Sequence, residues 1–90
     1  MRVYLLRTYQ MAGGNKTRLV RGVQLSMCAF PGLEISGLSA ATFVVQGVTY
    51  NAPVDALELS EAVRVVPDIR TLQITVNDDI THGWEVVTTP

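Results

Sequence analysis

Cysteine, histidine and charged residues are scarce in this chain of 90 residues. The single cysteine, Cys28, excludes a disulfide within the chain. Together with the single histidine, His82, it cannot supply the roughly four ligands of a closed structural zinc site. Domains this small commonly need disulfides, a metal or oligomerisation for stability. Oligomerisation is the route that remains, and we expect no metal and no cofactor.

Charged residues make up 17% of the chain, against about 25% in typical proteins, whereas hydrophobic residues make up 48%. A small domain has more surface to cover in proportion to its volume than a large one. We therefore expect part of the folded surface to be apolar and to meet another protein subunit, so that the chain forms an oligomer or joins a larger assembly. The alternative is a monomer whose surface is covered by Thr, Ser, Asn and Gln.

The sequence contains no apolar run near the roughly 18 residues that a transmembrane helix requires. The apolar run at 3–6 is too short for the central part of a signal peptide, and Arg7 follows it directly. An unpaired Cys28 fits a reducing compartment. We expect cytoplasmic synthesis, with no secretion by a signal peptide and no span across a membrane.

Valine and threonine are abundant, and their β-branched side chains favour strands. Hydrophobic and polar residues alternate along 17–27 and along 70–77, and further strand candidates lie at 2–9 and 84–89. Turn residues separate these segments. The pattern predicts a mainly β fold, a small antiparallel β-sandwich or partly open barrel, in which 1–90 is one domain with a short flexible C-terminal end.

Residues 43–50 are predicted to form a tight hairpin. Gln46 and Gly47 would be its two-residue turn, with a positive φ at Gly47. This register pairs Phe43 with Tyr50, an aromatic pair across the two strands.

Residues 55–66 fit two patterns. Asp55 and Glu58 have the spacing of a capping box at the start of a helix. Leu57 and Leu59, in contrast, alternate with polar residues as in a strand. We favour a short helix at about 56–63, followed by a strand, as the one helix of the fold.

The glycine-rich stretch at 11–19, "MAGGNKTRL", has a superficial likeness to a phosphate-binding loop. In such a loop a glycine precedes the lysine, but Asn15 precedes Lys16. The loop should also open a helix, whereas the residues that follow alternate as in a strand. We interpret Gly13 and Gly14 as part of the tip of a β-hairpin that spans about 2–27.

Charge is unevenly distributed along the chain. The first 21 residues carry five basic residues and no acidic one, and the remainder carries two basic and eight acidic residues. The basic residues of the first segment are Arg2, Arg7, Lys16, Arg18 and Arg21. They could mix with acidic groups of neighbouring strands, meet an acidic protein surface, or contact nucleic acid. The mild acidity of the whole chain argues against nucleic acid as the partner.

No catalytic constellation is recognisable. A nucleophile at Cys28 would need His82 as its base, but Cys28 has no glycine elbow or other motif around it. Asp78, Asp79 and His82 could approach a divalent ion, yet such residues are common in turns that bind no metal. The sequence therefore predicts a protein that is not an enzyme.

Taken together, these features predict a structural or assembly protein, a small β-rich subunit that binds other subunits of a larger particle. The concrete hypothesis is a cement or connector component of a viral capsid or tail. The alternative is a small binding or regulatory module, which binds nucleic acid or inhibits another protein through the basic hairpin. The expected contact residues are Arg7, Lys16, Arg18, Arg21 and Trp84, although for Trp84 a position at one end of the core is favoured over an interface.

Overall fold

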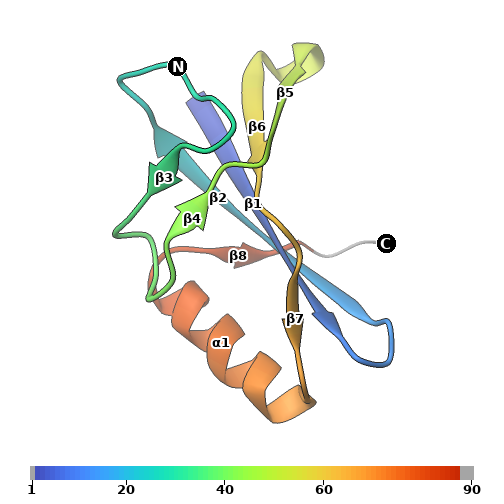
Figure 1. Ribbon diagram of the computed structural model, residues 1–90. Helices are drawn as coiled ribbons and strands as arrows, with labels where there is room; N and C mark the ends of the chain where they lie inside the picture. The colour runs from blue at the N-terminus through green and yellow to red at the C-terminus, as the bar shows by residue number, and fades with distance from the viewer. Residues whose placement is uncertain (1, 88–90) are drawn as a thin grey trace.

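The computed structural model describes residues 2–87 (Figure 1). Its elements are, in order, β1 (Arg2–Met11), β2 (Lys16–Gln24), β3 (Glu34–Ile35), β4 (Phe43–Val44), β5 (Gly47–Asn51), the 3-10 turn η1 (Ala52–Val54), β6 (Ala56–Ser60), β7 (Arg64–Val66), α1 (Ile69–Thr81) and β8 (Glu85–Val86). The prediction of a mainly β fold with one helix is confirmed. A short flexible C-terminal end was predicted, and the last residues of the chain, 88–90, lie outside the described residues.

Six strands form the main sheet. Its order is β5-β6-β1-β2-β8, with β7 paired to β1 beyond the end of β6, and β3 and β4 form a separate two-stranded sheet. β1 and β2 are an antiparallel hairpin as predicted, and Gly14 has a φ of +91° in its loop. β6 and β7 run parallel to β1, so the main sheet is mixed rather than antiparallel. Parallel pairing joins segments distant in the sequence, which local patterns do not reveal.

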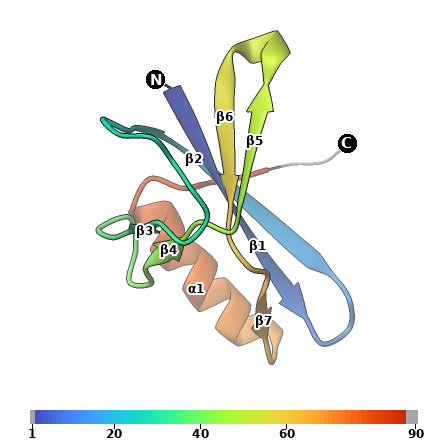
Figure 2. The same cartoon turned by 45° about the horizontal axis from the view of Figure 1, so that its top comes forward.

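One face of the main sheet carries the core. Val3, Leu5, Arg7 and Tyr9 alternate along β1 and are all buried on this face. Figures 1 and 2 show α1 and the β3–β4 ribbon on one side of the long β1–β2 hairpin. These elements and the turn after the helix bring a second set of buried side chains against the sheet, namely Phe43, Val45, Leu72 and Trp84. Within residues 2–87, no helix is long and apolar enough to cross a membrane.

The segment 70–77, predicted to be a strand, is part of α1, and that prediction is wrong. Asp68 caps the helix, because its Oδ1 accepts a hydrogen bond from the Thr71 backbone N at 2.8 Å. Leu72 and Asp79 face the sheet and are buried, whereas Ile74 is 62% exposed. Only one side of α1 contacts the sheet. Residues two positions apart lie on nearly opposite sides of a helix, so Ile74 points into solvent when Leu72 faces the sheet.

The prediction of a helix at about 56–63 is also wrong. β6 is a strand, and Asp55 has a φ of 49° at the end of η1 instead of capping a helix. The hairpin predicted at 43–50 is absent as well, because β4 pairs with β3 and β5 pairs with β6. Gly47 serves a different purpose from the one expected. A Cβ there would lie 2.7 Å from Ser60 Oγ, so the glycine allows β5 and β6 to approach closely.

Candidate functional site

A β-bulge interrupts the strand that pairs with β1. Leu6 is opposite Ser60 in β6, and Tyr9 is opposite Arg64 in β7. Two β1 residues therefore face three residues, 61–63, on the other side. An extra residue reverses which side chains point inward. Leu59 before the bulge, Glu61 at its first position and Val66 after it are buried, whereas Val63 and Val65 are turned outward.

The bulge places Glu61 against a fully buried arginine. Arg7 forms an ion pair with Glu61 through Nε and with Asp79 of α1 at 3.0 Å. It also donates a hydrogen bond to Ser39 Oγ at 2.9 Å. Its guanidinium carbon lies 4.7 Å from the centre of the Trp84 ring. Arg7 thereby joins the sheet, the helix and the loop before β4.

A second arginine and a tyrosine complete this buried charge cluster. Arg64 Nε lies 3.0 Å from Glu61 Oε1, and the Tyr9 hydroxyl donates a hydrogen bond to Asp79 Oδ2. Two guanidinium groups thus balance two carboxylates in the cluster of Arg7, Tyr9, Glu61, Arg64 and Asp79. Every buried side-chain nitrogen and oxygen among the described residues has a hydrogen-bond partner. Full satisfaction makes such a cluster a rigid part of the core.

The cluster changes the acidity of two of its members. Burial raises the pKa of Tyr9, and the hydrogen bond to Asp79 raises it further. Burial alone would lower the pKa of Arg7, but the hydrogen bond and charge of Glu61 outweigh that effect and raise it. Both groups therefore keep their protons at physiological pH.

The same bulge forms one wall of a cleft. The β5–β6 pair ends at the hydrogen bond from Gln46 N to Ser60 O, 2.7 Å long. Beyond this hydrogen bond the two segments of the chain diverge, because the residues before β5 lead to β4 and the residues after β6 lead to β7. A cleft of about 500 Å³ lies in this fork, between residues 31–32 and 44–46 on one side and 61–64 on the other. We call it the fork cleft.

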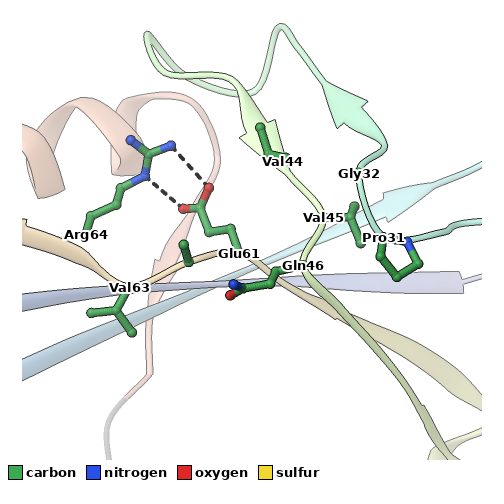
Figure 3. Close-up of a pocket in the computed structure, with 9 residues that line it drawn as sticks. Pro31, Gly32, Val44, Val45, Gln46, Glu61, Val63 and Arg64 are labelled. Atoms are coloured by element: carbon green, nitrogen blue, oxygen red, sulfur yellow. Dashed lines mark hydrogen bonds and ion pairs between the residues drawn. The ribbon is translucent and has the colours of Figure 1, made fainter.

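Apolar side chains supply most of the fork cleft's surface. Val44 is 44% exposed and Val63 is 47% exposed, and Pro31 and Ala62 lie beside them. Figure 3 shows the Arg64 and Glu61 side chains joined at one end of the cleft, with Pro31 and Val44 on its other side. Arg64 Nη2 also donates to the Thr42 carbonyl oxygen at 3.0 Å, which holds the two branches of the fork together.

The residues that line the fork cleft are mostly apolar and are suited to binding an apolar group. None of the nine lining residues is a serine, cysteine, histidine, aspartate or lysine. The carboxylate among them, Glu61, is 3% exposed and is engaged by Arg7 and Arg64. The valine walls are complementary to an apolar side chain, and the exposed Gln46 amide offers a polar contact at the rim.

Two of the residues expected at a contact surface lie in the interior. Arg7 is 0% exposed, and its charge is used by the buried cluster. Trp84 is 1% exposed, stacks with Phe43 at a ring-centre distance of 6.0 Å, and donates from Nε1 to the Leu38 carbonyl oxygen at 2.9 Å. Trp84 therefore occupies the core position that was favoured for it, and neither residue is available to a partner of the folded chain.

The other three predicted residues are separated by the pleat of β2. Lys16 and Arg18 are exposed on the face of the hairpin opposite the core. Arg21 is on the core side, is half-buried, and donates to the Leu38 carbonyl oxygen at 3.2 Å. The basic hairpin therefore offers a pair of cations near its tip and not a continuous basic surface.

The polar residues near the end of α1 and Cys28 are not assembled into a site. Asp79 points into the core, whereas His82 is exposed and its Nδ1 contacts the Asp78 carbonyl oxygen. Cys28 is exposed in the loop after β2. No group of three or more His, Cys, Asp or Glu side chains in the described part of the chain is placed to hold a metal ion.

The residues of the fork cleft were not foreseen. One signal for the buried cluster is present in the sequence: Arg7 occupies an inward position between Leu5 and Tyr9 of an alternating strand. A charge at such a position requires a buried counter-charge. No comparable signal reveals the bulge, which depends on the pairing of 56–66 with β1.

We compared the chain with protein-family models, with curated proteins and with solved structures. None of them matches it.

Proposed function

We propose that this protein is a non-enzymatic assembly subunit that binds other protein subunits through the fork cleft. The observation that carries the proposal is the outward turn of Val63 by the bulge, which with Val44 gives the cleft apolar walls. A partner would insert an apolar side chain between these walls, in the manner of a binding hot spot.

The low charge of the chain supports the same proposal. A small domain that leaves many large hydrophobic side chains in solvent gains free energy when a partner covers them. The exposed set includes Met27, Phe30, Val44, Val63, Val65 and Ile74. A component of a viral capsid or tail is the concrete assembly that we propose, on the grounds of small size, strand content and scarce charge.

The test is a substitution inside the fork cleft. Val63→Asp places a charge on an apolar wall, and Val86→Asp is its control because Val86 in β8 has nearly the same exposure, 46% against 47%. Each variant is purified from the native source under mild conditions, and the mass of its complex is measured by light scattering during gel filtration. We expect the wild type and Val86→Asp in complexes well above the 9.8 kDa of the chain, and Val63→Asp released from them.

Two results would contradict the proposal. A wild type that elutes as a monomer at all concentrations, or a Val63→Asp variant that keeps its partners, would overturn the proposal. A monomer that binds oligonucleotides, with an affinity that falls steeply with salt, would favour the alternative of a nucleic-acid-binding module.

A further inference from the structure

The two edges of the main sheet differ in how they are protected. β8 is two residues long, contains Glu85, and covers only Leu19 and Val20 of β2. Short strands and charged side chains are common means of preventing unwanted strand pairing. β5, at the other edge, is five residues long and has the sequence GVTYN, with no charge and no proline.

Within residues 2–87, no strand pairs with the outer side of β5. β5 pairs with β6 on one side, and Figures 1 and 2 show no other labelled element against its outer side. Along such an edge strand, alternate residues direct their backbone N–H and C=O groups away from the sheet. Val48 is 38% exposed and Tyr50 is 55% exposed, so apolar side chains accompany these backbone groups.

We propose that β5 pairs with β5 of a second copy of this chain, antiparallel and about a twofold axis at Thr49. This inference names one partner of the assembly proposed above, and it rests on that proposed function. The sheets of two copies would then join edge to edge, which is a self-complementary arrangement typical of twofold dimers.

The sequence of β5 supports self-pairing in this register. Thr49 is the middle residue of the strand, so centring the axis there pairs all five residues. Val48 of each copy then lies opposite Tyr50 of the other, and a β-branched residue beside an aromatic ring is a favourable pair across strands. Because the strand has no charged residue, no like charges oppose each other.

The new pair also continues an existing apolar surface. Val48 is opposite Leu59 of β6, and Tyr50 is opposite Leu57, on the face of the sheet that carries the core. The Tyr50 hydroxyl donates a hydrogen bond to Asp55 Oδ1 at 2.7 Å, which restrains the ring at the edge. Self-pairing would therefore bury Val48 and Tyr50 of both copies beside leucines that are already in place.

Cysteine crosslinking tests both the pairing and its register. In a Cys28→Ser background, Thr49→Cys is exposed to mild oxidation at protein concentrations up to about 1 mM. Directly opposed residues have Cβ atoms about 4.5–5.5 Å apart, close to the spacing in a disulfide. We expect Thr49→Cys to form a crosslinked dimer at least about tenfold faster than Val48→Cys alone. A mixture of Val48→Cys and Tyr50→Cys should crosslink as the mixed dimer.

The rate at which the wild-type protein crosslinks through native Cys28 gives the rate of random collision, because Cys28 is exposed and lies outside the sheet edge. Equal rates for Thr49→Cys and for native Cys28 would overturn the inference, as would a wild type that sediments as a monomer at about 1 mM. Trp84 fluorescence verifies that each variant is folded. Release of partners by Val63→Asp without crosslinking at Thr49 would leave the proposed function standing and refute the self-pairing. The reverse pattern would refute the cleft and support β5.

Discussion

Replacement of Arg7 by methionine tests whether the buried charge cluster holds the fold together. Methionine keeps the unbranched aliphatic stem and removes the guanidinium. Glu61 retains Arg64 at 3.0 Å after this change. Asp79, which is 1% exposed, loses its cation and retains the hydroxyl of Tyr9. The main consequence of Arg7→Met is therefore one buried carboxylate without a counter-charge.

The expected loss is large for a domain of this size. Removing one partner of a buried ion pair costs about 3–5 kcal/mol, because the other charge is left without compensation. A chain of 90 residues has a free energy of unfolding of roughly 5–13 kcal/mol. Arg7→Met should therefore remove about a quarter of the total stability or more, and could leave the domain only marginally folded.

Urea denaturation at pH 7, followed by the fluorescence of the single Trp84, measures this loss. Asp79→Asn provides the decisive comparison. In the wild type it should be destabilising, because it removes a partner of Arg7. In the Arg7→Met background it should be stabilising, because it removes the uncompensated charge. A loss below about 1 kcal/mol for Arg7→Met, or an equal effect of Asp79→Asn in both backgrounds, would refute the reasoning.

Two further predictions concern pH. Because the pKa of Tyr9 is raised from 10.0 by burial and by Asp79, the stability it contributes is complete below about pH 10 and is lost as pH rises towards its folded pKa. Tyr9→Phe should show a shallower alkaline loss in denaturation series above pH 10, and identical slopes would contradict this. The pKa of Asp68 is lowered from 3.8 by the hydrogen bond from Thr71 N, so its stabilisation is complete above about pH 4 and is lost as pH falls through its folded pKa. Asp68→Ala should be less stable than wild type at pH 6 and approach it near pH 2, whereas a constant difference would exclude a charged helix cap.

The β1–β2 hairpin could be predicted because its determinants are local. Gly13 and Gly14 mark the tip, and alternating residues mark the strands on either side. The sequence of α1 illustrates the limit of such reasoning. Its apolar residues fit a strand, and the better signal was Asp68 as a helix cap, directly after Pro67. Only packing against the sheet decides that Leu72 is buried and Ile74 is exposed.

The fork cleft depends entirely on contacts between distant segments. Nothing within 56–66 requires an extra residue opposite β1. The bulge arises because that segment pairs in parallel with β1 both before and after Arg7. It aims Glu61 at Arg7, and it turns Val63 outward into the cleft. The outward position of Val63 is therefore a consequence of strand register.

The sequence by itself determined the class of the fold, the first hairpin and the shortage of charge, because composition and period-two alternation depend on neighbouring residues alone. The tertiary structure decided which basic residues reach solvent. Arg7 lies in the core and Arg18 on the surface because they have opposite positions in the pleat of the hairpin, and one face of that hairpin is covered by α1 and β4. Which side chains are buried depends on how the layers pack against each other. Because Arg7 is buried, the proposed contact surfaces are the fork cleft and the edge of β5 and not the basic hairpin.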